Sequence, residues 1–223
     1  FSSFDISNSF FQINLAPESR DITSYSTKTR HVRFRKCPQG LSCSPSAFLG
    51  QFYSIFRPEL QQSFVAYVDD GLTFSNTFSD QMDILRKIFV KLQRTKLKIN
   101  PSKSTFCTST AEMLGFKFSA DGIQVSENRF QKIRDIKPLR NVKEVKMISG
   151  FLAYFRKFIP GFAILMSPIR NLLKADVKFE WTDEHTQSLE KIKELLLQNA
   201  TLSYPNMKET MYLNSDASSA GIS

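Results

Sequence analysis

Two adjacent carboxylates, Asp69 and Asp70, are the residues of this sequence that point most directly to chemistry. They stand between two runs rich in Val, Phe, Tyr and Thr, and Gly71 follows them, so residues 64–75 are predicted to form a β-hairpin. Asp and Gly favour turns for backbone reasons alone, and a solvated turn is therefore the simplest interpretation. Two neighbouring carboxylates repel each other, however, and apolar strands on both sides hold them together at a cost in free energy.

A divalent cation would remove that repulsion. Mg²⁺ is held in proteins by one or two carboxylates together with the phosphates of a substrate. The doublet therefore suggests metal-dependent phosphoryl transfer, which needs a further carboxylate elsewhere in the chain. Asp5, at the end of a short predicted strand, could supply it, although Asp followed by Ser and Asn is also good capping chemistry for the turn that follows.

The composition limits the class of protein. The chain has 223 residues, 41% of them hydrophobic and 23% charged, which is typical of a globular protein with a real core. Lys and Arg outnumber Asp and Glu by 30 to 21, and a net charge of +9 favours a polyanionic partner, although it can also serve solubility alone. The three cysteines lack metal-type spacing and are expected to be free thiols in a reducing compartment, and two histidines make a histidine zinc site or a Ser-His triad improbable.

No segment of the sequence resembles a membrane span or a signal peptide. The longest apolar run, near residues 158–166, is short and contains a Pro and a Gly. The chain begins with Phe1, and we expect it to be a piece of a longer protein.

Several elements can be predicted around the acidic hairpin. A turn at residues 38–40 leads to Ser44 and Pro45, which predict an N-cap and a helix to about Phe56 with aromatic residues on one face. Residues 80–94 are predicted to form an amphipathic helix capped by Ser79, and residues 113–125 a second hairpin. Further helices are expected after residue 126, after the pair Asn141 and Glu144, over 163–174, and over 183–198.

Basic residues gather in two stretches. Residues 18–36 alternate partly between basic and apolar residues, which predicts an exposed hairpin that is either solvated or in contact with nucleic acid. Residues 128–157 contain nine Lys or Arg and two Asp or Glu, a net +7 of the chain's +9. This concentration favours a directed binding surface over general solubility.

Three ordered motifs resemble motifs A, B and C of reverse transcriptases. They are Phe4-Asp5 with residues 10–13, Pro38-Gln39-Gly40 with residues 44–48, and Tyr67-Val68-Asp69-Asp70. Their order and spacing are similar to those of retroviral and gypsy-type LTR-retrotransposon enzymes. The resemblance implies a palm domain whose metal-binding residues surround two Mg²⁺ ions, with Mn²⁺ as an alternative: Asp5, Ile6, Asp69 and Asp70.

The resemblance also implies a nucleotide site. Phe10 falls where the family carries an aromatic residue that excludes a 2′-hydroxyl, which selects deoxynucleotides. Gln39 matches a residue near the incoming nucleotide, where gypsy-type elements often have Phe, so it follows the retroviral pattern. The nucleotide-binding set is Phe10, Gln39, Gly40 and Tyr67. Gly71 departs from the family, which commonly has a bulkier apolar residue there, and we expect it to soften the turn.

Later motifs imply further roles. Lys103 lies in a segment similar to motif D and would protonate the pyrophosphate leaving group. Met113, Leu114 and Gly115 resemble the primer grip, and a helical thumb would contact the primer–template through Lys143, Lys146 and Arg156. Asp216 would be the first metal-binding carboxylate of an RNase H domain whose other carboxylates are absent, so RNase H activity is not expected from this piece.

The expected fold is α+β: an antiparallel polymerase palm with packed helices, then a helical thumb and the first strand of an RNase H-like domain. The predicted division is palm 1–125 with a partial fingers segment at about 14–43, thumb 126–174, connection 175–209, and the start of RNase H at 210–223. The resemblance implies further fingers upstream that bind the triphosphate, and the piece alone is expected to be weak or inactive.

The leading hypothesis is an RNA-directed DNA polymerase core of a retroelement Pol polyprotein. Its expected partners are an RNA/DNA primer–template, dNTPs and the rest of Pol, including RNase H and integrase, with a dimer also allowed and no membrane. The expected location is intracellular, in a cytoplasmic virus-like particle with a nuclear phase allowed. The alternative is a catalytically inactive nucleic-acid-binding remnant, and Phe10 disfavours an RNA-directed RNA polymerase.

Overall fold

The computed structural model describes the chain except for residues 61–62, 199–200, 213–216, 219–220 and 223. Contacts divide it into two compact units, which are described separately. The first contains Phe1–Ala120 and Val125–Lys137, and the second contains Asp121–Gln124 and Pro138–Ser223. Within the described ranges, no helix is long and apolar enough to span a membrane.

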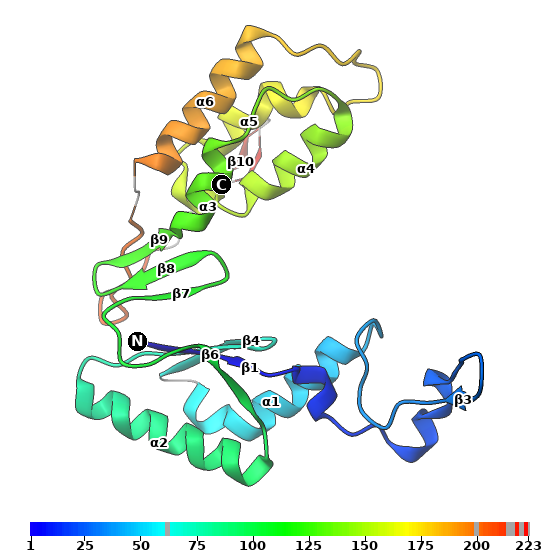
Figure 1. Ribbon diagram of the computed structural model, residues 1–223. Coiled ribbons are helices and arrows are strands. Elements are labelled where there is room, and N and C mark those ends of the chain that lie inside the picture. Colours follow the sequence, from blue (N-terminus) through cyan, green and yellow to red (C-terminus); the bar gives the residue numbers. More distant parts are fainter. Residues whose placement is uncertain (61–62, 199–200, 213–216, 219–220, 223) are drawn as a thin grey trace. The chain divides into compact units, whose positions relative to one another are not determined.

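The first unit is built on a four-stranded antiparallel sheet with strand order β4-β5-β1-β6. Its strands are β1 (Ser2–Ile6), β4 (Phe64–Tyr67), β5 (Asp70–Thr73) and β6 (Ile99–Thr105). Helices α1 (Ser44–Leu60) and α2 (Phe78–Thr95) lie against one face of this sheet (Figure 1). On the other face, Leu72 of β5 is buried with Ala111 and Met113, while Asp5 of β1 is half-buried.

Aromatic residues fill the space between the sheet and the helices. Along β1, residues Ser2, Phe4 and Ile6 are buried and the residues between them are half-buried, because alternate side chains of a strand point to opposite faces. Phe4 stacks on Phe64 of β4, with ring centroids 5.5 Å apart. The expected aromatic face of α1 is confirmed, and its three buried members are Phe48, Phe52 and Phe56. Full burial of such a side chain stabilises the fold by about 1.5–3 kcal/mol.

The predicted acidic hairpin is confirmed, but its turn differs from the expectation. The turn residues are Val68 and Asp69, and Val68 has a φ of 52°. Gly71 lies within β5, opposite Phe4 on one side and Ala66 on the other. A Cβ at Gly71 would stand 2.6 Å from the Phe4 ring. The expectation that Gly71 softens the turn is therefore wrong, because this glycine makes room for the Phe4 and Phe64 rings.

Two predicted helix caps are also corrected. Ser44 is the first residue of α1, and its hydroxyl donates to the Pro38 carbonyl oxygen at 2.9 Å instead of capping the helix. For α2, the N-cap is Thr77, whose hydroxyl oxygen accepts from the Asp80 amide at 3.1 Å. Ser79 stands inside that helix. For α2 the neighbouring residue Thr77 takes the capping role, and periodicity does not distinguish it from Ser79.

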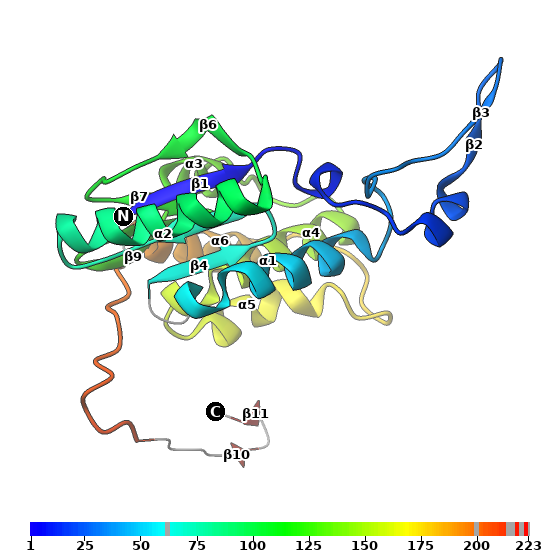
Figure 2. The same ribbon diagram turned by 90° about the horizontal axis from the view of Figure 1, so that it is seen from below.

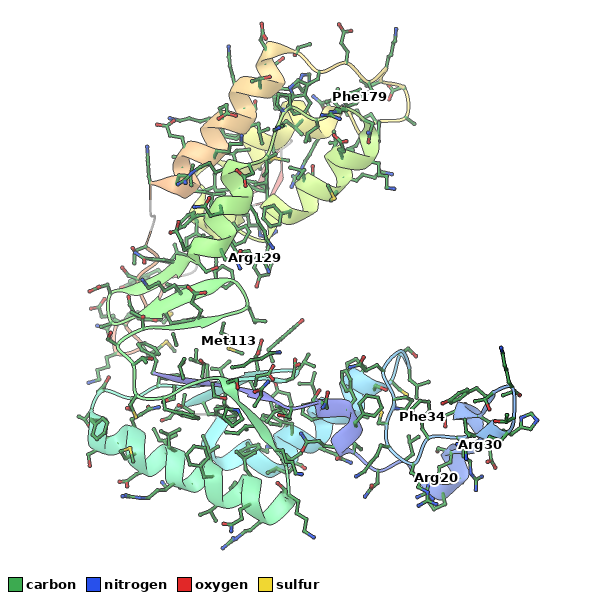
Figure 3. The ribbon with its side chains drawn as sticks, viewed as in Figure 1. Arg20, Arg30, Phe34, Met113, Arg129 and Phe179 are labelled. Atoms are coloured by element: carbon green, nitrogen blue, oxygen red, sulfur yellow. The ribbon has the colours of Figure 1, made fainter. Side chains whose placement is uncertain are left out.

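The basic segment forms an exposed arm of the first unit. It contains the 3₁₀ turns Pro17–Ser19 and Asp21–Thr23 and the short strands β2 (Tyr25–Ser26) and β3 (His31–Val32), and a further 3₁₀ turn, Ser9–Gln12, lies before it, after β1. The predicted exposed hairpin is confirmed, although each of its strands has two residues. The arm projects from the sheet in both views (Figures 1 and 2). Figure 3 labels Arg20, Arg30 and Phe34 on this arm.

A smaller sheet follows, with strand order β7-β8-β9. Its strands are β7 (Ala111–Met113), β8 (Phe116–Ser119) and β9 (Gly122–Val125), and helix α3 (Glu127–Arg134) comes next. The hairpin predicted over 113–125 is confirmed, with β7 as an additional strand. Leu114 and Gly115 form the tight turn between β7 and β8 and have φ values of 55° and 82°. Positive φ at both central residues is characteristic of a type I′ hairpin turn.

The second unit is mainly helical, as predicted. Its helices are α4 (Val142–Ala153), the 3₁₀ turn Arg156–Phe158, α5 (Phe162–Asn171) and α6 (Asp183–Leu197). Asn141 caps α4 by accepting from the Glu144 amide at 2.9 Å, and Thr182 caps α6 together with His185. The buried side chains include Leu152, Phe155, Met166, Ile169 and Ile192. Short strands β10 (Ala217–Ser218) and β11 (Gly221–Ile222) pair near the end of the chain.

Candidate active site

The sheet brings the doublet and Asp5 together across neighbouring strands. Asp5 on β1 is directly opposite Asp70 on β5. The Ile6 amide donates to the Asp69 carbonyl oxygen at 2.8 Å, which ties the turn of the hairpin to the end of β1. Alternation along β1 turns Asp5 away from the helices, and its side chain is 18% exposed. The three predicted carboxylates therefore belong to neighbouring positions at one end of the two central strands.

Burial and charge both act on Asp70. Burial raises the pKa of this carboxyl, and the carboxylates of Asp69 and Asp5 raise it further, while Lys103 acts in the opposite direction. An isolated turn carboxylate would feel none of these effects. The site therefore concentrates negative charge that its own surroundings do not neutralise.

Lys103 reaches the site from β6. Its Nζ lies 3.8 Å from Oδ2 of Asp5, and its side chain is 67% exposed. A pair this exposed contributes little to stability. The pairing of β1 with β6 shifts register between Ser3 and Asp5, and Lys103 lies in the irregular part of β6. Bulges of this kind redirect side chains beside active sites, which accounts for a lysine next to Asp5.

The donor set suits a hard divalent cation, because carboxylate oxygens are the ligands that Mg²⁺ prefers. In the described part of the chain, however, no three His, Cys, Asp or Glu side chains are gathered closely enough to hold a metal ion. Ile6 has a buried side chain, so it could bind a cation only through its main-chain carbonyl.

The predicted nucleotide-binding residues lie in three segments of the first unit. Phe10 lies in the 3₁₀ turn after β1, half-buried, with its ring edge-on to Phe48 at 6.1 Å between centroids. Gln39 and Gly40 are exposed in the turn before α1, where Gly40 has a φ of 95°. Tyr67 ends β4 opposite Asp70 and is exposed.

The predicted primer-contacting turn has a basic neighbour that sequence analysis missed. Met113 is buried beside Leu72 and Ala111, whereas Leu114 is exposed at the turn. A Cβ at Gly115 would stand 2.7 Å from Nε of Arg129, so the arginine side chain lies over this glycine (Figure 3). The position of Arg129 in the sequence did not indicate this contact, because the contact depends on how the chain between Gly115 and α3 folds back.

The remaining predicted residues lie in the second unit. Lys143 and Lys146 are exposed on α4, and Arg156 is exposed in the 3₁₀ turn that follows it. Asp216 lies outside the described residues.

Gln12 is a second residue that sequence analysis did not single out. It lies at the end of the 3₁₀ turn that carries Phe10, and its side-chain amide bonds to the main chain of Lys98, 86 residues later. Gln12 is part of the motif quoted above. Its contact with Lys98 could not be predicted, because two residues so far apart in the sequence show no periodic pattern.

An antiparallel sheet with two helices on one face, and acidic residues at the end of its central strands, defines the palm class of polymerase. Residues 1–118 match the family described as reverse transcriptase (RNA-dependent DNA polymerase). Residues 181–223 match the RNase H-like domain found in reverse transcriptase. The chain therefore belongs to the reverse transcriptase family, as the motifs predicted.

Curated relatives are retroelement polyproteins. The chain is 31% identical over 219 residues to the retrovirus-related Pol polyprotein from transposon 412 of Drosophila melanogaster, covering 98% of this chain and 18% of the relative. It is 29% identical to the Pol polyprotein from transposon 297 of the same organism, covering 100% and 21%. The Tf2-3 polyprotein of Schizosaccharomyces pombe is 27% identical over 222 residues, covering 100% and 17%. The chain spans about a fifth of the length of these relatives.

Solved structures support the same fold. The foamy viral protease-reverse transcriptase in complex with an RNA/DNA hybrid matches with a TM-score of 0.81 and 27% identity, over 91% of this chain and 28% of that one. The same viral protein with double-stranded DNA matches with a TM-score of 0.84 and 26% identity, over 93% and 44%. The α+β polymerase fold expected from the sequence is confirmed.

Proposed function

We propose that this chain is the catalytic core of an RNA-directed DNA polymerase within a retroelement Pol polyprotein, and that it adds dNTPs to a primer 3′-hydroxyl. The observation that carries the proposal is the pairing of Asp5 with Asp70 across β1 and β5, with Asp69 tied to Ile6 beside them. These carboxylates lie within residues 1–118, the range that matches the reverse transcriptase family.

Asp5, Asp69 and Asp70 would hold the divalent ions, with Mg²⁺ as the expected species and Mn²⁺ as an alternative. Reverse transcriptases generally use divalent metal ions, and a bound ion supplies a lowered pKa for the attacking hydroxyl and charge neutralisation on the triphosphate. The residues' own contribution is position: two carboxylates are fixed on paired strands and the third in the connecting turn. The raised pKa of Asp70 shows that its ionised form is disfavoured, and a bound cation would favour that ionised form.

Lys103 would act as the general acid. Its ammonium lies 3.8 Å from Oδ2 of Asp5 on an exposed side chain, so it is placed to reach an oxygen that departs from this site. As the bond between the α- and β-phosphates breaks, Lys103 would donate a proton to the pyrophosphate oxygen that leaves.

Phe10 would select the sugar, and Gln39, Gly40 and Tyr67 would complete the nucleotide pocket. The Phe10 ring is supported from behind by Phe48, whose own ring is buried, so it can present a firm edge to the 2′ position. The exposure of Gln39 and Gly40 leaves them available to an incoming nucleotide.

The primer–template would contact the turn Leu114–Gly115 and the exposed basic residues Lys143, Lys146 and Arg156. Support comes from the matching foamy viral structures, which were solved in complex with an RNA/DNA hybrid or with double-stranded DNA. Phosphate contacts by Lys and Arg fix position without reading sequence, which suits a polymerase that must accept any template.

The test is incorporation of dTTP on a poly(rA)–oligo(dT) duplex with Mg²⁺, measured together with duplex binding. It is run on the 223-residue chain and on a longer version that includes the coding sequence upstream of it. We expect the active version to lose incorporation with Asp69→Asn while it keeps duplex binding. Duplex binding by the wild type without incorporation in either version would favour the alternative, a catalytically inactive remnant.

A further inference from the structure

Gln12 makes three side-chain hydrogen bonds to main-chain groups. Its Nε2 donates to the carbonyl oxygen of Lys98 at 2.9 Å and also to that of Ser7. Its Oε1 accepts from the Lys98 amide at 2.7 Å. The primary amide therefore pairs with Lys98 in the way that a peptide group of an adjacent strand would.

These bonds extend the β1–β6 ladder past the end of β1. The regular pairing of β1 with β6 ends at Ile6 and Ile99, and the Ser7 amide then donates to the Lys98 carbonyl oxygen at 2.9 Å. The chain turns away at Asn8, which has a φ of 46°. Gln12 brings it back to Lys98, so residues 7–12 form a loop closed at both ends, with Phe10 inside it.

The segment after Gln12 pairs with the residues that lead to Gln39. The Leu15 amide donates to the Arg35 carbonyl oxygen at 2.9 Å, and the Cys37 amide donates to the Ile13 carbonyl oxygen at 3.0 Å. Gln12 thus stands where the three segments that carry Phe10, Gln39 and Lys103 meet.

Packing alone does not hold this loop. A cavity of about 250 Å³ lies behind it, and its lining includes Gln12, Phe48, Gln51 and Leu97. Because this pocket is partly open, packing on that side of Gln12 is incomplete, and the loop can shift when its hydrogen bonds are lost. The Gln12 bonds therefore act together with the Phe48 contact to fix the Phe10 ring.

We propose that Gln12 is a positioning residue that sets the discrimination between deoxynucleotides and ribonucleotides by holding Phe10 in place. The inference rests on the proposed function, since it concerns the same nucleotide site. Gln12 itself is bonded to main-chain groups and acts through Phe10. Loss of its amide should let the aromatic ring retreat, which admits a 2′-hydroxyl and weakens the hold on the deoxyribose.

The test compares kcat/KM for dTTP and rUTP on one template within each variant, because such a ratio does not depend on how much of a preparation is folded. Gln12→Glu keeps the shape of the side chain but cannot donate to the two carbonyl oxygens, and Gln12→Met keeps its length without any hydrogen bond. Both variants should lower the dTTP/rUTP ratio by about tenfold or more, mainly through a higher KM for dTTP. Gln51→Ala is the matched control, an exposed glutamine on the same cavity, and should leave the ratio unchanged.

Hydrogen exchange at the Lys98 amide provides a second readout that needs no catalysis. In Gln12→Met this amide should lose protection, while amides in the centre of β1 keep theirs. An unchanged dTTP/rUTP ratio in both variants, or a Lys98 amide that stays protected in Gln12→Met, would overturn the inference. Failure of the wild type to incorporate dTTP in the longer version, which includes the coding sequence upstream of the chain, would overturn the proposed function and this inference together, which is a distinguishable result.

Discussion

At the scale of single residues, the surroundings of Asp70 disfavour its ionised form, and a bound cation would offset this effect. Burial, then Asp69, then Asp5 oppose its ionisation, and only Lys103 favours it. The doublet and its need for a further carboxylate could be predicted from residue types, because adjacent Asp residues between apolar strands are costly without a function. The contribution of burial could not, since it depends on the sheet that surrounds Asp70.

The raised pKa of Asp70 predicts how stability changes with pH when no divalent cation is present. A carboxyl with a folded-state pKa above the unfolded value of 3.8 gives stability that is present below that value and lost as pH rises through the raised pKa. In EDTA at pH 7, Asp70→Asn should therefore unfold a few degrees above the wild type, and the difference should vanish toward pH 3. Thermal unfolding followed by circular dichroism measures this. A variant less stable than the wild type at pH 7 would contradict it.

Gln12 and Arg129 mark the limit of prediction from residue types. Gln12 bonds to Lys98 far along the chain, and Arg129 lies over Gly115 across a helix–turn junction. The Gln12 contact joins residues far apart in the sequence, and the Arg129 contact depends on the path of the chain between the turn and α3. The sequence indicates that such polar residues exist, whereas the fold decides which main-chain groups they meet.

At the scale of elements, hydrophobic periodicity located the helices because each buries one apolar stripe. Periodicity did not identify the capping residues. Thr77 instead of Ser79 caps α2, and the Ser44 hydroxyl donates to the Pro38 carbonyl oxygen instead of capping α1. Gly71 was misplaced for a related reason, since a glycine beside two Asp residues resembles a turn. Its role is to let β5 pass beneath two aromatic rings, and that close approach is visible only in the packed sheet.

The close approach at Gly71 makes a prediction about the sheet. A Cβ there would meet Phe4 ring atoms at 2.6 and 2.7 Å and a Phe64 ring atom at 2.9 Å, so Gly71→Ala must displace buried rings. We expect it to lower the free energy of unfolding by about 1–3 kcal/mol, as overpacking does.

Gly50→Ala is the matched control for this prediction. Gly50 lies in α1, and a Cβ there would meet nothing within 4 Å, so the substitution should stabilise the helix by about 0.5–1 kcal/mol. Urea unfolding of both variants gives the comparison. Equal effects of the two substitutions would show that the ring contacts do not constrain β5.

At the scale of the whole molecule, the family was predicted from the ordered set of motifs, and the match over residues 1–118 confirms it. Each motif by itself has an ordinary structural explanation, and their order makes the combination specific. The division of the chain into compact units was harder to predict. Contacts assign α3 to the first unit, although its sequence begins the basic stretch that continues into the second.

The charge distribution predicts a strong salt dependence of duplex binding. Lys143, Lys146 and Arg156 are exposed in the second unit, and each phosphate contact adds about 0.9 to the slope of log K against log salt concentration. Lys143→Ala with Lys146→Ala should therefore weaken binding on all sequences alike and reduce the slope by about 2. Fluorescence anisotropy across a salt series measures this. Lys174→Ala, an exposed lysine outside the predicted binding set, is the control, and an unchanged slope in the double variant would place the duplex elsewhere.

The central claim is that Asp5, Asp69 and Asp70 form one divalent-cation site. Its most direct test is a titration of Mn²⁺ into the protein with a bound primer–template, with free Mn²⁺ followed by electron paramagnetic resonance. We expect the wild type to bind Mn²⁺, and we expect Asp5→Asn and Asp70→Asn each to lower the affinity for Mn²⁺ by about tenfold or more, since each removes a carboxylate ligand. Mn²⁺ binding that is absent from the wild type, or equal in the wild type and both variants, would contradict it.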